Sequence, residues 1–150
     1  EQPIPRHDRQ AQARVSARSP VPIMADEAIE SVEDSFALAQ AGAAPVFALK
    51  IAKNGGPRAM LRTAAIAEAA GIGLYGGTML EGGIGTLASA HAFATLGRIE
   101  WHTELFGPLL LTHDILTEPL IYRDFQLMIP TTPGLGVALD EERLKRFQRH

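Results

Sequence analysis

Four charged residues stand at or near the ends of short apolar segments, and their types could support metal-assisted proton chemistry. Asp26 ends PIMAD, Lys50 lies in VFALKI, Glu104 follows IEWHT, and Glu1 opens the chain. Carboxylate oxygens are the ligands that Mg²⁺ and Mn²⁺ prefer in proteins. A lysine exchanges protons near neutrality when burial or a nearby metal lowers its pKa by roughly 3 units from about 10.4. Glu1 and Asp26 are therefore candidate metal ligands, and Lys50 and Glu104 are candidate catalytic residues.

Each of these residues also has a structural interpretation. Asp26 could cap a helix or form an ion pair at a strand–helix junction, and Glu1 could be a solvated terminal charge. Lys50 could extend its ammonium to solvent from a buried stem. Glu104 could pair with Lys50 or fix a substrate proton, or it could form an ion pair of only structural value. Lys53, in the loop after Lys50, is more typical of a structural or solvated lysine.

The elements that must position these residues follow a strand–loop–helix cycle. Apolar segments begin at residues 21, 46, 72 and 99, a spacing of 25 to 27 residues. Continuous apolarity is typical of strands buried on both faces of a parallel sheet. Charged residues at the carboxyl ends of such strands are how a parallel α/β barrel displays a reactive site. The fold class is therefore α/β, with about half of the eight strands of a TIM-type barrel. We expect strands over 21–25, 46–51, 72–75 and 99–105, a helix between the caps Ser31 and Gly42, and helices over 58–70 and 86–96.

The regular spacing ends at Phe106. We expect irregular structure next, then a strand over 121–129 and a charged helix or tail over 140–149. The glycine-rich segment GGTMLEGGIG lacks the Lys-Ser/Thr of a P-loop and the spacing of the dinucleotide fingerprint. We interpret it as a loop whose backbone amides approach a substrate carboxylate.

Composition excludes several classes of function. The formal net charge of −3 gives no nucleic-acid signature, and no apolar run reaches the roughly 20 residues that a membrane span needs. The absence of cysteine excludes a disulfide scaffold, a thiolate metal site and a cysteine nucleophile. It is also compatible with a cytoplasmic location, which we expect. Because the first residue is Glu rather than Met, we expect a cut or processed chain, or a piece of a longer one.

Five segments in order resemble the carboxyl-terminal part of the muconate cycloisomerase (muconate lactonizing enzyme) family of the enolase superfamily. They are EQP, PIMADE, ALKIAKNGG, GGTMLEGGIGTLASAHAF and HTELFGP. The resemblance covers essentially the whole chain. It implies the carboxyl-terminal half of a TIM-type (β/α) barrel over 1–105, from the end of strand 4 to strand 8. Residues 106–150 would be an extension that packs on the barrel and returns toward a capping domain.

The resemblance also implies roles for the charged residues. Glu1 and Asp26 match the second and third carboxylate ligands of Mn²⁺ or Mg²⁺. Lys50 matches the sixth-strand lysine that faces the reaction centre, and Glu104 matches the acidic residue of the eighth strand. The first metal ligand, the Lys-x-Lys pair that transfers the proton, and the capping domain would all precede residue 1. We therefore expect the isolated chain to be inactive and to require the missing amino-terminal half.

The reaction implied for the complete enzyme is syn cycloisomerisation of the dicarboxylate cis,cis-muconate to muconolactone, in aromatic degradation through catechol and β-ketoadipate. Family members are commonly homo-oligomers, so we expect one here. The alternatives within the superfamily are chloromuconate cycloisomerase, o-succinylbenzoate synthase and acyl-amino-acid racemase or dipeptide epimerase. From a different class, a non-catalytic half-barrel fragment is a further alternative.

Overall fold

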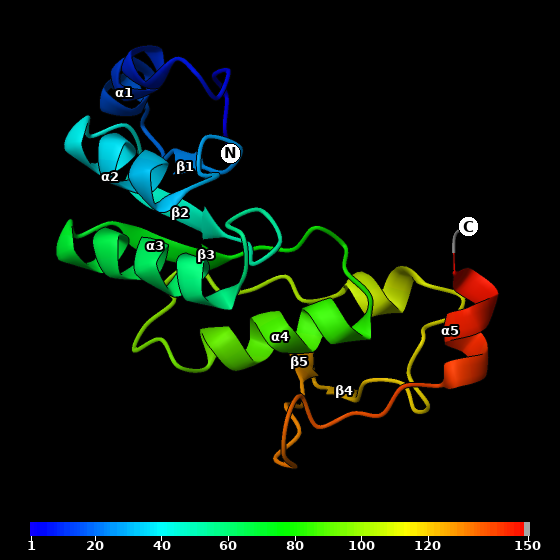
Figure 1. The fold of residues 1–150 in the computed structure, drawn as a ribbon. Coiled ribbons are helices and arrows are strands. Elements are labelled where there is room, and N and C mark those ends of the chain that lie inside the picture. The colour runs from blue at the N-terminus through cyan, green and yellow to red at the C-terminus, as the bar shows by residue number, and fades with distance from the viewer. Residues whose placement is uncertain (149–150) are drawn as a thin grey trace.

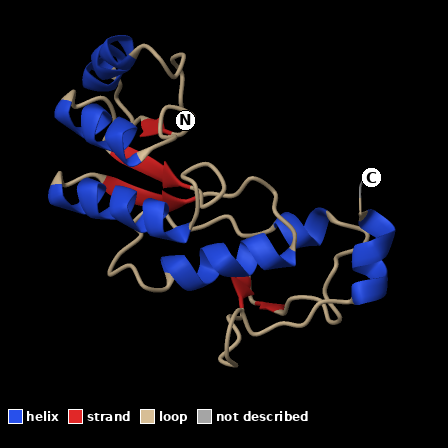
Figure 2. Cartoon of the chain, in the orientation of Figure 1, coloured by secondary structure: helices blue, strands red, loops and turns tan. Residues whose placement is uncertain are grey.

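Helices and short parallel strands alternate through the amino-terminal part of the chain, and loops dominate after α4 in the computed structural model, which describes residues 1–148 (Figures 1 and 2). The helices are α1 (Arg9–Arg18), α2 (Val32–Gln40), α3 (Pro57–Ala69), α4 (Gly83–Phe93), the 3₁₀ helix η1 (Gly107–Leu110) and α5 (Glu141–Phe147). The strands are β1 (Met24–Ala25), β2 (Val46–Leu49), β3 (Gly73–Gly76), β4 (Tyr122–Arg123) and β5 (Gln126–Leu127).

The first three strands form a parallel sheet in the order β1–β2–β3. Met24 pairs with Val46, and Leu49 pairs with Gly76. Parallel neighbours require crossover connections, which α2 and α3 provide; these helices pack on each other, and α3 also packs on β2 and β3 (Figure 1). The α/β class is therefore confirmed, as are strands within the predicted ranges 21–25 and 46–51.

The helix ends follow from local sequence. The Ser31 hydroxyl accepts the backbone N–H of Asp34 at 3.0 Å, which satisfies a free amide in the first turn of α2. Gly42, just beyond α2, adopts a left-handed backbone with φ 58°, which glycine tolerates without steric cost. Pro57 begins α3, where its missing N–H has no helical partner to lose. The predicted Ser31 cap is confirmed, whereas the C-cap residue is Ala41 and Gly42 directly follows it.

The core lies between the sheet and the helices that cover it. All four residues of β2 are buried, and Phe47 and Leu49 are fully buried. Leu38 of α2 and Met60 of α3 are fully buried in the same cluster. A central strand covered in this way explains why its sequence is continuously apolar rather than alternating.

The prediction of a complete strand over 99–105 is wrong. Thr103 forms only an isolated parallel bridge with Gly76. His102, the preceding residue, has a left-handed φ of 63°, which interrupts an extended strand. The Glu104 amide nevertheless donates to the Gly76 carbonyl at 2.9 Å. The segment therefore runs beside β3, in the place of a fourth strand.

The predicted single strand over 121–129 is also wrong, because this segment folds back as the hairpin β4–β5. Asp124 and Phe125 form its two-residue turn, and both have positive φ, 48° and 63°. Positive φ at both positions is the geometry of the tight turn that matches the twist of antiparallel strands.

Two helix boundaries also differ from expectation. Helix α4 begins at Gly83, before the predicted start at residue 86, and ends at Phe93, before the predicted end at residue 96. The carboxyl-terminal helix is present as α5, and residue 149 of its predicted range lies outside the described residues.

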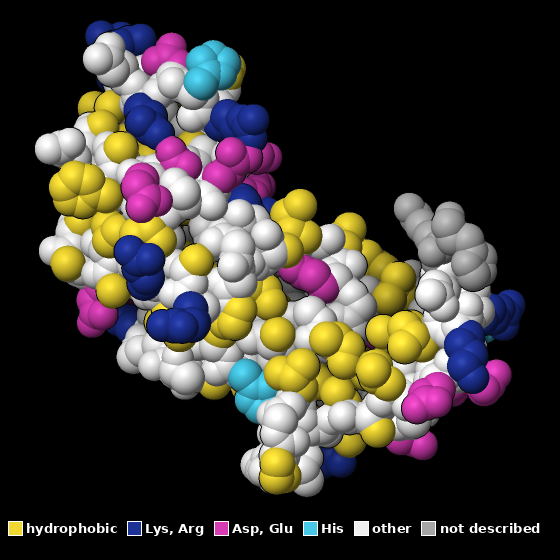
Figure 3. All heavy atoms as spheres, in the orientation of Figure 1, with side chains coloured by type: hydrophobic (Ala, Val, Ile, Leu, Met, Phe, Trp, Pro, Cys, Tyr) yellow, Lys and Arg dark blue, Asp and Glu magenta, His cyan; other side chains and the backbone are white. Residues whose placement is uncertain are grey.

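The segment after residue 105 packs back on α4 and on the end of the fourth-strand segment. Asp114 accepts the first amide of α4, that of Gly83, at 2.6 Å. The Tyr122 hydroxyl donates to the Leu105 carbonyl at 2.7 Å. Figure 3 shows an open, L-shaped molecule with apolar side chains gathered over its carboxyl-terminal part. Among residues 1–148, no helix has the length and apolarity to cross a membrane.

Candidate active site

Asp26 lies at the centre of the charged cluster, directly after β1. Its side chain is only 3% exposed and accepts hydrogen bonds from two ammonium groups. Lys50 donates to Oδ2, and Lys53 donates to Oδ1. Both lysines follow β2, the neighbour of β1, so the shared carboxyl edge of the two strands brings the three side chains together. The ion pair expected in the structural interpretation of Asp26 is therefore present.

The charges of the cluster alter one another's protonation. Burial acts to raise the pKa of Asp26, but hydrogen bonds from Lys50 and Lys53 outweigh it and lower that pKa below its ordinary value. Burial lowers the pKa of Lys53, and its hydrogen bond to Asp26 opposes this only in part. Lys53 also donates to the Ala48 carbonyl at 3.2 Å and is 10% exposed, so it is a buried member of the cluster and not a solvated lysine.

Glu1 lies next to Asp26. Its pKa is raised, first by a hydrogen bond with the Asp26 carboxyl, then by burial and by repulsion from the same group. Residue 1 itself is exposed. The structure thus brings together three of the four predicted site residues, namely Glu1, Asp26 and Lys50.

Gln2 is a contributor to the site that sequence reasoning missed. Its backbone N–H donates to the Met24 carbonyl at 2.8 Å, which sets residues 1 and 2 beside β1. Its side-chain carbonyl accepts the backbone N–H of Asp26 at 2.9 Å. Because Gln2 is uncharged, only its place next to Glu1 could have drawn attention to it.

The Lys50 side chain packs closely against a glycine, Gly77. A Cβ placed on Gly77 would lie 2.6 Å from Lys50 Cε and 3.0 Å from Cγ. Gly77 follows β3, the strand on the other side of β2. The first residue of the glycine-rich loop after β3 therefore provides space for the lysine stem, a role that its sequence did not reveal.

Glu104 stands apart from this cluster. Its carboxylate accepts the backbone N–H of Thr78 at 3.2 Å. Burial raises the pKa of Tyr75, and a hydrogen bond with Glu104 raises it further, so the phenol stays neutral beside this carboxylate. The suggested pairing of Glu104 with Lys50 is wrong, because the Lys50 ammonium is bound to Asp26 instead.

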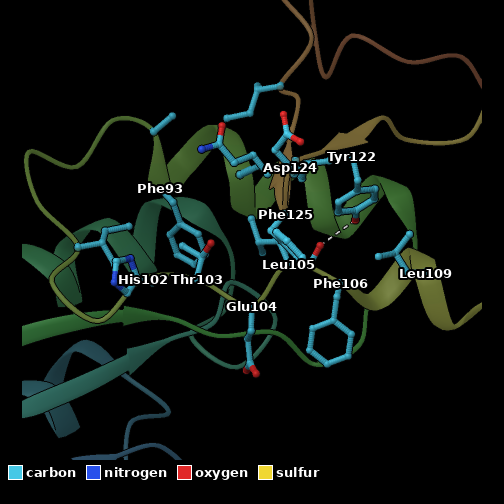
Figure 4. Close-up of a pocket in the computed structure, with 16 residues that line it drawn as sticks. Phe93, His102, Thr103, Glu104, Leu105, Phe106, Leu109, Tyr122, Asp124 and Phe125 are labelled. Carbon is cyan, nitrogen blue, oxygen red and sulfur yellow. Dashed lines mark hydrogen bonds between the residues drawn. The ribbon is translucent and has the colours of Figure 1, made fainter.

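An apolar groove of about 1010 Å³ lies next to Glu104, which forms part of its lining. In Figure 4 the Glu104 side chain points away from Phe93, Tyr122 and Phe125, and toward the same side as Phe106. Phe93 of α4, Tyr122 of β4 and Phe125 of the hairpin turn are among the residues that line the groove. Neither Asp26 nor Lys50 lines this groove, so we do not assign the active site to it.

Metal binding by residues 1–148 alone would rest on an incomplete ligand set. Within this range, no group of three or more His, Cys, Asp or Glu side chains is arranged to hold a metal ion. Glu1 and Asp26 are two adjacent carboxylates, the type of oxygen ligand that Mn²⁺ and Mg²⁺ prefer. Two carboxylates are too few to complete such a metal site.

The fold and the site together define a class of protein. A parallel sheet covered by helices, with Asp26 and Lys50 at the carboxyl ends of neighbouring strands, is part of a (β/α) barrel whose site lies at that rim. The family model described as "Enolase C-terminal domain-like" matches residues 1–143. The chain belongs to this family.

Individual relatives narrow the comparison. Muconate cycloisomerase 1 of Pseudomonas putida is 73% identical over 149 residues, which are 99% of this chain and 40% of the relative. Muconate cycloisomerase 1 of Acinetobacter baylyi is 49% identical, over 100% of this chain and 40% of the relative. A muconate lactonizing enzyme from Pseudomonas fluorescens, solved in complex with muconolactone, has a TM-score of 0.96 and 73% identity over 99% of this chain and 40% of its own. The chain therefore spans about two-fifths of the length of these relatives.

Proposed function

We propose that the chain is the carboxyl-terminal barrel portion of a muconate cycloisomerase, an isomerase that converts cis,cis-muconate to muconolactone. The observation that carries the proposal is the cluster of Glu1, Asp26 and Lys50 at one rim of a sheet, in a chain 73% identical to the Pseudomonas putida enzyme. Chloromuconate cycloisomerase of the same species is 42% identical. This difference favours the unchlorinated substrate.

Glu1 and Asp26 are the residues that would hold Mn²⁺ or Mg²⁺. A cation between the two carboxyls would favour their ionised forms, and so offset the hydrogen bond and burial that now raise the pKa of Glu1. When bound, such a metal supplies positive charge against the charge that develops on a substrate carboxylate. By the family resemblance, the third carboxylate ligand belongs to the amino-terminal half.

Lys50 and Glu104 would act on the substrate from two sides of the rim. The Lys50 side chain is 11% exposed and anchored on Asp26, so its ammonium is held next to the proposed metal ligands. There it would give electrostatic support opposite the proton-transferring lysine of the amino-terminal half. Glu104, held by the Thr78 amide, would orient the substrate from the end of the fourth-strand segment.

The chain would function only with the amino-terminal part of the barrel and the capping domain. Among residues 1–148 the sheet has three strands, with the Gln2 backbone beside β1 and the Thr103 segment beside β3, so further strands could pair beyond these two segments. The apolar groove next to Glu104 is a surface of the kind that further protein usually covers. Residues 1–105 would be the barrel portion, and 106–150 an extension packing on the barrel and the capping domain. The complete protein would be a cytoplasmic homo-oligomer, as the family resemblance implies.

A chimera tests this proposal. Residues 1–150 replace the matching segment of Pseudomonas putida muconate cycloisomerase 1, and we call the product the reconstituted enzyme. Loss of diene absorbance is followed with cis,cis-muconate and Mn²⁺, and the product is identified by NMR. We expect metal-dependent formation of muconolactone by the reconstituted enzyme and none by the isolated chain.

Two variants locate the activity within this segment. Lys50→Met should abolish turnover, whereas Lys145→Met, at a lysine 66% exposed on α5, should leave it unchanged. If the folded reconstituted enzyme converts only chloromuconate, a succinylbenzoate precursor or a dipeptide, that compound is the substrate and cis,cis-muconate is not. Inactivity toward all of these compounds would favour a non-catalytic half barrel.

A further inference from the structure

We propose that Gln2 is a positioning residue that sets the relative placement of the carboxyl groups of Glu1 and Asp26. The inference rests on the metal-binding role proposed above for these two residues, and it concerns how the chain holds them in place. Glu1 and Asp26 come from separate segments, so a feature of the fold must fix the distance between them. Gln2 is covalently next to the first and hydrogen-bonded to the second.

The side-chain carbonyl of Gln2 holds the turn that carries Asp26. Its Oε1 accepts the backbone N–H of Asp26 at 2.9 Å and that of Ala28 at 3.3 Å. These two amides lie on either side of Glu27, in the turn that follows β1. Asp26 and Ala28 are both buried. Leaving a buried amide without a partner is unfavourable, so these two hydrogen bonds hold the Gln2 oxygen in place.

The side-chain amide of Gln2 fixes the orientation of that carbonyl. Its Nε2 donates to Gln12 Oε1 at 2.6 Å and to the Ile4 carbonyl at 2.7 Å. Gln12, on α1, is 1% exposed and therefore a rigid partner. All four hydrogen-bonding positions of the Gln2 amide group are used. A reversed amide would turn its N–H₂ toward two backbone N–H groups, so the partners allow one orientation only.

The two carboxyl groups differ in how firmly they are otherwise held. Lys50 and Lys53 bind the Asp26 side chain directly. Residue 1 is exposed, and its position depends on the Gln2 backbone, which is tied to β1 through the Met24 carbonyl. Loss of the Gln2 side chain should therefore let the distance between the two carboxyl groups vary more widely. The affinity for a metal ion bound by both groups should then fall.

The test compares three variants of the reconstituted enzyme. Gln2→Met keeps the length of the side chain and removes its hydrogen bonds. Gln12→Leu removes only the anchor on α1, and Gln10→Met makes the same chemical change at an exposed residue of that helix. Free Mn²⁺ is measured by electron paramagnetic resonance to give the dissociation constant, and the thermal midpoint is measured without metal.

We expect Gln2→Met to raise the Mn²⁺ dissociation constant at least tenfold, Gln12→Leu to raise it at least threefold, and Gln10→Met to leave it unchanged. Saturating Mn²⁺ should restore kcat of Gln2→Met to within threefold of the parent, which a general loss of structure would not permit. Mn²⁺ affinity within twofold of the parent in Gln2→Met overturns the inference, and if that variant does not fold, the same result in Gln12→Leu overturns it. A folded parent that binds no Mn²⁺ would instead overturn the proposed metal site, and this inference with it.

Discussion

Replacing Gly77 by alanine should displace Lys50 without removing its charge. The new Cβ would lie 2.6 Å from Lys50 Cε, whereas ordinary van der Waals contact begins at 3.4 Å. The end of the lysine must therefore move by roughly 1 Å, and a misplacement of about that size can cost on the order of 10²-fold in rate. We expect kcat of the reconstituted enzyme to fall about 100-fold, which corresponds to about 2.7 kcal/mol of activation free energy.

The same substitution should change stability much less than activity. The atoms that the Cβ would meet all belong to the flexible Lys50 side chain, and Gly77 is not among the glycines with a left-handed backbone. Overpacking costs about 1–3 kcal/mol. The reduced backbone entropy of the unfolded chain offsets about 0.4–1 kcal/mol of that cost. The thermal midpoint should therefore fall by only a few degrees.

Gly97→Ala is the matched control, because a Cβ at Gly97 meets no atom within 4 Å. Steady-state kinetics with cis,cis-muconate and thermal unfolding are measured for both variants in the reconstituted enzyme. Activity of Gly77→Ala within twofold of the parent would refute the reasoning. An equal loss in Gly97→Ala would also refute it, because the effect would then not depend on Lys50.

Three further predictions concern stability. Asp26→Asn leaves two buried ammonium groups without their anionic partner and should cost about 3–5 kcal/mol of unfolding free energy in urea. Glu27→Gln, at its exposed neighbour, should change that free energy by no more than about 0.5 kcal/mol. Because hydrogen bonds from the two lysines lower the pKa of Asp26 despite its burial, its contribution is complete above the ordinary value of 3.8 and is lost as the pH falls through the lowered pKa. The difference in urea midpoint between the parent and Asp26→Asn should therefore narrow as the pH falls below 3.8 and through the lowered pKa of Asp26. A difference that stays constant over this pH range would contradict the lowered pKa. Ser31→Ala should cost about 1 kcal/mol, measured by thermal unfolding, because the Asp34 amide loses its cap; an unchanged midpoint would count against that contact.

The sequence was most informative where burial alone decides the structure. The run from Val46 was predictable as a strand because both faces of β2 are covered, which leaves only apolar residues in it. It was least informative where single residues adopt left-handed backbones. His102 interrupts the expected strand over 99–105, and Asp124 and Phe125 turn the expected strand over 121–129 into a hairpin. None of these three is glycine, the residue that adopts a left-handed backbone most readily, so the strongest sequence signal was missing.

The clustering of Glu1, Asp26 and Lys50 was predictable from their places at strand ends, but the pairing of the charges was not. Asp26 and Lys50 end neighbouring strands, and strand order alone could have favoured this pair over Lys50 and Glu104, which β3 separates. The buried position of Lys53 depends on the course of the loop after β2, which residue types do not specify. Gln2 acts through the placement of its amide group and carries no charge, so only the structure shows its contribution.

The central claim, that Glu1 and Asp26 bind one metal ion beside Lys50, is tested most directly by crystallography. Crystals of the reconstituted enzyme grown with Mn²⁺ would give an anomalous signal that locates the metal. The account predicts one peak bonded to both the Glu1 and the Asp26 carboxylates, with the Lys50 ammonium facing the same site. A peak elsewhere, or one bonded to neither or only one of these carboxylates, would contradict it.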